Sequence, residues 1–230
     1  MSVNAIILAA GKGTRMNSDL LKVAHLVAGK PMVNYVIEAV LELDVKKIML
    51  VVGHQADSIK ETIKNEKIKY VVQEEQLGTG HAVMQTAPES QSLSEDPVII
   101  LAGDCPLIQP DSLIALLATH KESNATATIL TTKLEDAGQY GRIIRGEMNT
   151  VMGIKEAKDC SKKELQIKEI NTGIYIINKA ELYNNLNKLN TNNKQGEYYL
   201  TDIFHIIKES GGVVAYHCLE DSNQAIGINN

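Results

Sequence analysis

The chain has 230 residues, of which 44% are hydrophobic and 22% charged, and its formal net charge is −5 at pH 7. This length allows one large α/β domain or two small ones, and the composition is that of a soluble globular protein with a full core. A negative charge without any lysine-rich block argues against a nucleic-acid partner. The N-terminal apolar run is too short for a transmembrane helix or a signal peptide, so we expect no membrane partner.

The rarer residue types narrow the class further. One Phe and no Trp leave the core to aliphatic side chains, which parallel sheets prefer. Cys105, Cys160 and Cys218 are odd in number and lack the spacing of a metal site. This usage indicates a reducing compartment, and we expect a cytoplasmic protein.

The first predicted strand, residues 3–8, runs directly into a loop that holds two glycines and two cations. Gly11 and Gly13 permit a close approach of the backbone to a ligand, and their N–H groups can bind an anion. Lys12, Arg15 and Lys22 add positive charge. Because ligands of open α/β sheets bind beyond the carboxyl ends of strands, this loop predicts a phosphate site.

The loop is not one of the two common phosphate loops. Met16 stands where a dinucleotide fingerprint has its third glycine, and Ile6 stands where a Walker loop has its first. An ordinary glycine turn with solvated lysines is the alternative. The combination of strand, glycines, arginine and lysine favours a phosphate site over that turn.

Strand and helix patterns alternate over the first half of the chain and change in the second half. Up to residue 124 we predict strands at 3–8, 47–52, 69–72 and 97–102, and helices at 31–43, 56–65, 79–87 and 111–123. Pro88 should stop the third helix, and Asp111 with Ser112 should cap the fourth. After residue 124 we predict strands at 125–131, 141–145, 150–155, 173–178 and 213–217, with helices at 179–189 and 200–209. This order predicts a doubly wound parallel sheet followed by a mixed, partly antiparallel part.

Two further strings lie at predicted strand ends. Asp104 follows the strand at 97–102, where one carboxylate could hold Mg²⁺ together with phosphates and waters; a turn aspartate before Pro106 is the alternative. Gln73 and Gln76 precede a predicted helix, and their amides could pair with a pyrimidine edge. Taken alone, this string is better explained as a helix start with solvated glutamines. Within the same string, Gly78 permits a close backbone approach, Thr79 is a candidate helix cap, and His81 is interpreted as a structural histidine.

The string at 8–16 together with Lys22, and the string at 73–82, resemble those of the sugar-nucleotide pyrophosphorylases. The resemblance is greatest to the uridylyltransferase domain of bacterial N-acetylglucosamine-1-phosphate uridyltransferases, and it runs from residue 3 to 230 with the strings in family order. It implies an α/β protein with a three-layer Rossmann-like nucleotidyltransferase fold, in which helices cover both faces of a mixed, mostly parallel sheet. It also implies one domain, 1–230, with a nucleotide-binding half at about 1–124, a sugar-binding half at about 125–230 and a ligand cleft between them.

The resemblance implies Mg²⁺-dependent transfer of a uridylyl group from UTP to N-acetylglucosamine 1-phosphate, which gives UDP-N-acetylglucosamine for peptidoglycan and lipopolysaccharide precursors. Arg15 and Lys22 would carry catalysis, and Asp104 and Asn229 would bind Mg²⁺. The implied substrate-binding residues are Leu8, Ala9, Ala10, Gly11, Lys12, Gly13, Lys22, Gln73, Gln76, Gly78, Thr79, Ala102, Gly103, Asp104, Gly141, Glu156, Asn171, Glu197, Tyr199, Thr201 and Asn229. Without the family, Asn171 would be interpreted as a turn residue and Glu156 as part of a solvated face.

The chain departs from the family pattern at Leu21, Ala24 and Ala102, which affect packing and loop shape. Bifunctional members continue into a left-handed β-helix acetyltransferase domain. These 230 residues contain no hexapeptide repeats, so we expect that domain to be absent from them and the chain to be a monomer. A pyrophosphorylase for another sugar phosphate or nucleotide, a nucleotide-binding module without activity, and a nicotinamide-linked oxidoreductase remain alternatives.

Overall fold

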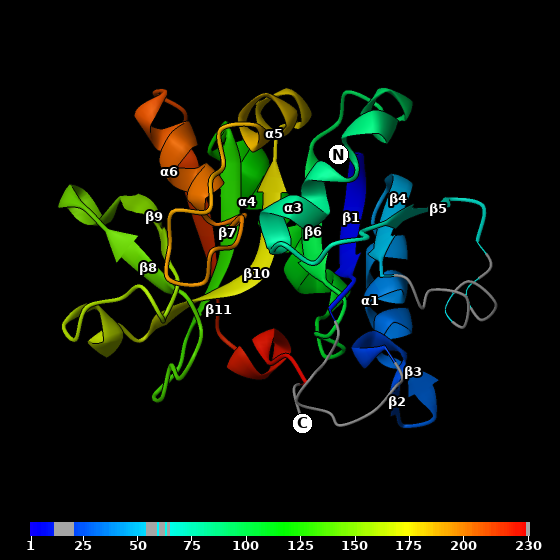
Figure 1. Cartoon of the computed structure of the whole chain (residues 1–230), viewed down its shortest axis with the longest axis horizontal. Coiled ribbons are helices and arrows are strands. Elements are labelled where there is room, and N and C mark those ends of the chain that lie inside the picture. Colours follow the sequence, from blue (N-terminus) through cyan, green and yellow to red (C-terminus); the bar gives the residue numbers. More distant parts are fainter. Residues whose placement is uncertain (12–20, 54–58, 60–62, 64, 229–230) are drawn as a thin grey trace.

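A central sheet runs through the molecule. The computed structural model describes residues 1–11, 21–53, 59, 63 and 65–228, and within them the sheet has nine strands. Seven follow the order β11-β7-β10-β6-β1-β4-β5, which can be traced across Figure 1, and the β8–β9 hairpin joins the sheet through β10. The strands are β1 (Val3–Ala9), β4 (Val45–Val52), β5 (Ile68–Val72), β6 (Val98–Ala102), β7 (Ala127–Lys133), β8 (Arg142–Arg145), β9 (Val151–Lys155), β10 (Glu169–Ile177) and β11 (Val214–Leu219).

Strand direction divides the sheet as the sequence predicts. The strands β5, β4, β1 and β6 are parallel to one another, so all four end at the same edge. The strand β10 is antiparallel to both β6 and β7, and β11 returns parallel to β7. The mixed sheet is therefore parallel where the phosphate loop is predicted and mixed in the second half.

Helices cover both faces of the sheet and form the outer two of three layers (Figure 1). Because side chains alternate along a strand, Ile7 of β1 packs with one apolar cluster and Ile6 with the other. The first cluster includes α1 (Met32–Leu41) and α4 (Pro110–Glu122). The second includes α3 (Thr79–Met84), α5 (Lys179–Leu186) and α6 (Asp202–Glu209). The predicted three-layer α/β fold is confirmed.

Three predictions of local structure are wrong. The helix predicted to reach residue 87 ends at Met84, and Pro88 lies in the first turn of a 3-10 helix, η3 (Ala87–Ser92), rather than stopping α3. Pro110 occupies the start of α4, where its missing N–H has no cost, so Asp111 lies in the first turn and does not cap the helix. The strand predicted at 173–178 is β10, which already begins at Glu169 and contains an irregular register between Asn171 and Tyr175.

A small hairpin of β2 (Leu26–Val27) and β3 (Lys30–Pro31) is not predicted from the sequence. Its two turn residues, Ala28 and Gly29, both have positive φ, at 48° and 84°. Such a pair is typical of a tight two-residue hairpin, which is seldom recognised without Asn-Gly or Asp-Gly. The helix predicted at 56–65 lies largely outside the described residues.

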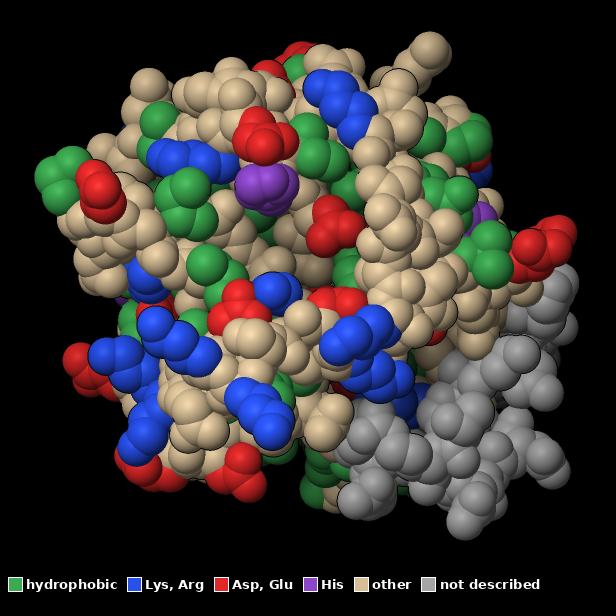
Figure 2. Space-filling model, turned by 60° about the vertical axis from the view of Figure 1, so that its left-hand side comes forward, with side chains coloured by type: hydrophobic (Ala, Val, Ile, Leu, Met, Phe, Trp, Pro, Cys, Tyr) green, Lys and Arg blue, Asp and Glu red, His purple; other side chains and the backbone are tan. Residues whose placement is uncertain are grey.

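The surface that carries the β8–β9 hairpin mixes both signs of charge. In Figure 2, Lys and Arg side chains gather at the lower left, with Asp and Glu side chains among them. Ion pairs join residues of this hairpin and its neighbouring segments: Lys155–Glu164 at 2.9 Å, Lys168–Glu135 at 2.5 Å and Arg145–Glu169 at 2.5 Å. Many of the cations on this part of the surface are therefore balanced by carboxylates.

No helix among the described residues is long and apolar enough to cross a membrane.

Candidate active site

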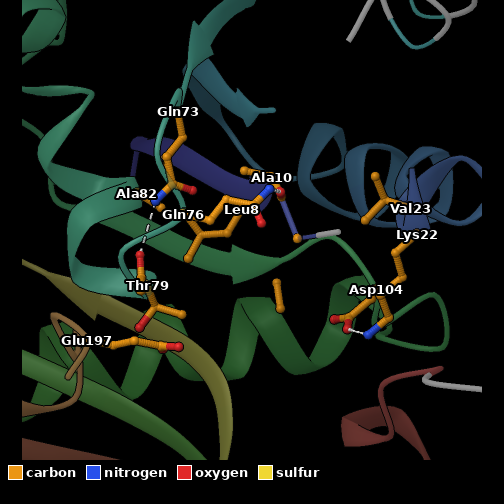
Figure 3. A pocket seen from close by; sticks show the side chains of 13 residues that line it. Leu8, Ala10, Lys22, Val23, Gln73, Gln76, Thr79, Ala82, Asp104 and Glu197 are labelled. Carbon is orange, nitrogen blue, oxygen red and sulfur yellow. Dashed lines mark hydrogen bonds and ion pairs between the residues drawn. The ribbon is translucent and has the colours of Figure 1, made fainter. Parts of the chain in front are cut away.

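A cavity of about 340 Å³ opens where β1, β5 and β6 end (Figure 3). The chain leaves β1 into Ala10 and Gly11, leaves β5 into Gln73, and leaves β6 into the turn that carries Asp104. Because these strands are parallel, their following residues converge on one edge, which is the usual ligand site of an open α/β sheet. The cavity is lined by Leu8, Ala10, Gly11, Lys22, Val23, Gln73, Gln76, Gly78, Thr79, Ala82, Ala102, Asp104 and Glu197.

Most of these lining residues are in the predicted set. Val23 and Ala82 are not in the predicted set; they form apolar parts of the cavity wall, and their side chains carry no chemical group that would indicate a binding role. The predicted residues Ala9 and Gly103 are buried beside the cavity rather than in its wall. Four predicted residues lie outside the described residues: Lys12, Gly13, Arg15 and Asn229.

Lys22 and Asp104 form an ion pair at one end of the cavity, drawn as a dashed line in Figure 3. Lys22 begins the short 3-10 helix η2 (Lys22–Ala24), and the side chains of the pair are only 12% and 22% exposed. The backbone N–H of Ile228 donates to the carbonyl oxygen of Asp104 at 3.0 Å, and Gly227 lies against the Asp104 carboxylate. The structure thus brings a cation, a carboxylate and the described end of the chain together at one point of the cavity.

At the opposite end, the two glutamines are anchored rather than solvated. Gln73 is 3% exposed, and its Nε2 lies 3.2 Å from the carbonyl oxygen of Gly78, to which it donates. Gln76 donates through Nε2 to the carbonyl oxygen of Ala10, which ties it to the end of β1. The alternative of solvated glutamines is therefore wrong for Gln73. Each amide is held in place before any ligand arrives.

Backbone hydrogen bonds fasten the second half of the chain to this wall. Tyr198 donates its N–H to the carbonyl oxygen of Leu77 at 2.8 Å, and the carbonyl oxygen of Tyr198 accepts from the N–H of Gly80 at 2.8 Å. The hydroxyl oxygen of Thr79 accepts from the N–H of Leu200 at 3.2 Å, and it makes no capping bond to α3, so the predicted cap is wrong. These contacts bring Glu197 to the cavity wall.

Three residues predicted to bind the sugar form a second cluster beside the cavity. Glu156 accepts a hydrogen bond of 2.9 Å from the hydroxyl of Thr201. Gly141 lies against both Glu156 and Asn171, since a Cβ added to it would be 3.5 Å from Glu156 Oε2 and 3.5 Å from the Cβ of Asn171. Burial raises the pKa of Glu156, and neighbouring carboxylates raise it further. The hydrogen bond from Thr201 acts in the opposite direction and lowers this pKa. Glu156 is therefore not on a solvated face.

This second cluster adjoins the cavity through β10. Asn171 is 9% exposed and donates to the hydroxyl of Tyr175 at 2.7 Å, while its Oδ1 accepts from the N–H of Gly173 at 3.0 Å. Gly173 packs beside Ala102 at the end of β6. The irregular part of β10 thus lies next to the cavity wall, and Asn171 is a strand residue rather than a turn.

Tyr199 is placed apart from the first cavity. Its hydroxyl donates to Asp159 Oδ2 at 3.2 Å, and burial raises its pKa to about 12. Together with Glu156 and Asp202 it lines a smaller cavity of about 220 Å³. The structure therefore brings eleven of the predicted binding residues into one cavity wall and separates Gly141, Glu156, Asn171, Tyr199 and Thr201 from that wall.

A three-layer α/β fold that places Gly11, a mostly buried lysine and a carboxylate at one edge of its sheet is typical of nucleotide-binding proteins. The chain matches the family model described as Nucleotidyl transferase over residues 4–223, and it belongs to that family. It is 44% identical over 229 residues to a protein of Syntrophomonas wolfei described as bifunctional protein GlmU, and 47% identical over 225 residues to the bifunctional protein GlmU of Enterococcus faecalis. These alignments cover 100% and 98% of this chain, which spans about half the length of those relatives, 51% and 49%.

Solved structures share the fold at low sequence identity. A UDP-glucose pyrophosphorylase complexed with UDP-glucose superposes with a TM-score of 0.78 at 17% identity, covering 94% of this chain and 90% of that one. The inositol-1-phosphate CTP transferase from T. maritima gives a TM-score of 0.72 at 19% identity, with 94% and 84% coverage. These likenesses confirm the Rossmann-like nucleotidyltransferase fold.

The close approach between Gly78 and Tyr198 generates a stability prediction. Gly78 has φ of 109°, and an added Cβ would lie 2.6 Å from the carbonyl oxygen of Tyr198, whereas Gly196 has φ of 65° with nothing within 4 Å. We expect Gly196→Ala to cost about 1–2 kcal/mol from backbone strain alone, and Gly78→Ala to cost at least about 1 kcal/mol more from steric overlap. Urea unfolding of both variants measures the difference, and equal costs would contradict the contact.

The raised pKa of Glu156 generates a pH prediction. A carboxyl whose folded pKa exceeds its unfolded value contributes stability below the unfolded value, and that contribution is lost as pH rises through the folded pKa. Glu156→Gln keeps an acceptor for Thr201 without the buried charge, so the variant should melt at a higher temperature than the wild type at pH 7. The gain should vanish near pH 4. The exposed Glu147→Gln is the control, and it should show no pH-dependent gain.

Proposed function

We propose that this chain transfers a uridylyl group from UTP to N-acetylglucosamine 1-phosphate, in a Mg²⁺-dependent reaction that releases pyrophosphate and gives UDP-N-acetylglucosamine. The observation that carries the proposal is the meeting of the Lys22–Asp104 pair and the anchored Gln73 in one cavity. One end of that cavity has charges for phosphates, and the other has amide groups for a base. Relatives described as bifunctional protein GlmU, 44–47% identical to this chain, support the same assignment.

The proposed binding mode divides the chain between the two substrates. Residues 1–124 would hold the nucleotide, with the base near Gln73 and Gln76 and the phosphates near Gly11 and Lys22. Residues 125–230 would hold the sugar phosphate through the cluster around Glu156. Carboxylate and amide groups suit sugar hydroxyls, because a site built to bond a hydroxyl rejects an analogue that lacks it. Glu197 would contribute from the second half, since its side chain reaches the first cavity (Figure 3).

The chemistry needs positioning more than proton transfer. A phosphate oxygen of the sugar phosphate forms a bond to the α-phosphorus of UTP, and the bond from that phosphorus to the bridging oxygen of pyrophosphate breaks. The attacking phosphate is already largely ionised at neutral pH, since its second pKa is about 6, so no general base is required. The work of the protein is in-line alignment and charge neutralisation. Lys22 would neutralise the reacting phosphates, and Lys12 and Arg15 are proposed to hold the leaving pyrophosphate.

The residues present suit a magnesium ion that is shared with the substrates. Among the described residues no group of three or more His, Cys, Asp or Glu side chains could hold a metal, so Asp104 would act with phosphates and waters, as Mg²⁺ sites commonly do. Gly227 and Ile228 contact Asp104, and the next residue in the sequence is Asn229, the proposed second ligand. Bound Mg²⁺ would supply charge neutralisation at the phosphates.

The remaining parts of the proposal rest on the sequence. A cytoplasmic location fits the three free thiols, and a monomer is the proposed state of this chain. A role in peptidoglycan and lipopolysaccharide precursor synthesis follows if the product is UDP-N-acetylglucosamine.

The first test is pyrophosphate release with UTP and Mg²⁺, in which N-acetylglucosamine 1-phosphate is compared with glucose 1-phosphate and glucosamine 1-phosphate. We expect kcat/KM to be highest for the N-acetylated sugar, by about tenfold or more, because a missing polar group leaves its partners unpaired. Preference for another sugar would overturn the roles of Glu156 and Asn171 while keeping the nucleotide site. Release from none of the sugars would leave a binding module.

Replacement of Asp104 tests the metal assignment. We expect Asp104→Ala to lower kcat by about a hundredfold or more, because a charged group that positions the phosphates is lost. The exposed Asp111→Ala, in the first turn of α4, is the matched control and should leave kcat near the wild-type value. Near-normal turnover of a folded Asp104→Ala variant would contradict the assignment.

A further inference from the structure

The buried Gln73 amide has a second partner that the proposed function does not use. Its Nε2 lies 3.1 Å from Nδ1 of His81, in addition to the bond of 3.2 Å to the carbonyl oxygen of Gly78. His81 lies in the first half of α3, and its ring stacks on Tyr198 with centroids 6.2 Å apart. The ring is therefore held between the cavity wall and the segment that brings Glu197 to the site.

The direction of the Gln73 amide follows from these two contacts. A backbone carbonyl oxygen can only accept, so the amide nitrogen must face Gly78, and one of its two N–H groups is used there. The second N–H points to His81, whose Nδ1 must then act as the acceptor. Both donors of Gln73 are satisfied inside the protein, and the amide oxygen is left for the cavity, as Figure 3 shows.

The other side of the ring accommodates this assignment. Nε2 of His81 lies 3.0 Å from the amide of Gln85, one turn further along α3. A neutral imidazole accepts at one nitrogen only, so when Nδ1 accepts, Nε2 carries the proton and the oxygen of the Gln85 amide must face it. Turning the Gln85 amide breaks a bond of 3.3 Å from its Nε2 to the carbonyl oxygen of His81, but Gln85 is partly exposed, so water can replace that bond. Gln73 is 3% exposed, so its bond to Gly78 has no such replacement. The Gln73 contact therefore decides the tautomer.

We propose that His81 is a positioning residue that determines base specificity, by fixing the Gln73 amide with only its oxygen toward the nucleotide. That oxygen accepts the N3–H of a uracil. Cytosine carries a lone pair at N3, so it faces the same oxygen with repulsion and cannot turn the amide without breaking the bonds to His81 and Gly78. The inference rests on the proposed nucleotide site and adds to it a reason for the choice between pyrimidines.

The test measures UTP and CTP side by side, both by calorimetric binding and by pyrophosphate release, in the full chain. We expect the wild-type protein to favour UTP. His81→Leu should reduce the ratio of UTP affinity to CTP affinity by about tenfold or more, because the hydrogen bond that fixes the Gln73 amide is lost. The loss should appear in the nucleotide KM and Kd rather than in kcat. His81→Asn offers an oxygen near the position of Nδ1 and should retain most of the ratio.

Gln85→Leu is the matched control, because it removes the partner of Nε2 and leaves the Gln73 contact in place. It should keep the wild-type ratio. An unchanged ratio in a folded His81→Leu variant, or equal wild-type binding of UTP and CTP, would overturn the inference. Selective UTP binding without pyrophosphate release would instead contradict the proposed function and leave the inference standing.

A measurement on the wild-type protein guards against a variant that fails to fold. Imidazole nitrogen chemical shifts of His81, recorded by NMR, report which ring nitrogen carries the proton. We expect the proton on Nε2. A proton on Nδ1 would remove the acceptor for Gln73 and overturn the inference without any mutation.

Discussion

Parallel pairing between β1 and β6 is the constraint on which the site depends. It places Leu8 opposite Ala102, so the chain leaves both strands at the same level of the sheet. Gly103 donates its N–H to the carbonyl oxygen of Leu8 at 2.9 Å, and an added Cβ would lie only 3.1 Å from that oxygen. The absence of a side chain at Gly103 lets the two strand ends touch, and this contact carries Asp104 to the edge where the β1 loop begins.

The opposite wall of the cavity is held by contacts of a different kind. Main-chain bonds join residues 77–80 to the segment at 198–200, and Gly78 and Gly80 both approach the carbonyl oxygen of Tyr198 too closely for a Cβ. A wall fixed through backbone atoms tolerates little displacement, because no side chain can turn to absorb it. The amides of Gln73 and Gln76 are positioned against this fixed wall, and their bonds to other parts of the protein give them their orientation in advance.

The sequence was most informative where a pattern is local. Apolar runs located the buried strands to within a few residues, as for 3–8 against β1, and their alternation with helices predicted the layers. The glycine loop and the strand-end Asp104 located the cavity because parallel strands end together. Gln73 is different: its amide is held by Gly78 and His81, and the periodicity of the sequence does not reveal such contacts. The role of Thr79 was missed for a similar reason, since its partner Leu200 lies 121 positions away.

The strand β10 has a consequence for how the two proposed halves relate. It belongs to the second half, yet it lies between β6 and β7 and hydrogen-bonds to both. The border between the halves is therefore a backbone pairing of β6 with β10 rather than a linker, and separation there would expose the edges of both strands. Two such regions cannot swing apart about a hinge or be exchanged as modules. We expect them to unfold as one unit, and we expect an opening for the proposed substrates to come from the loops at the edge of the sheet.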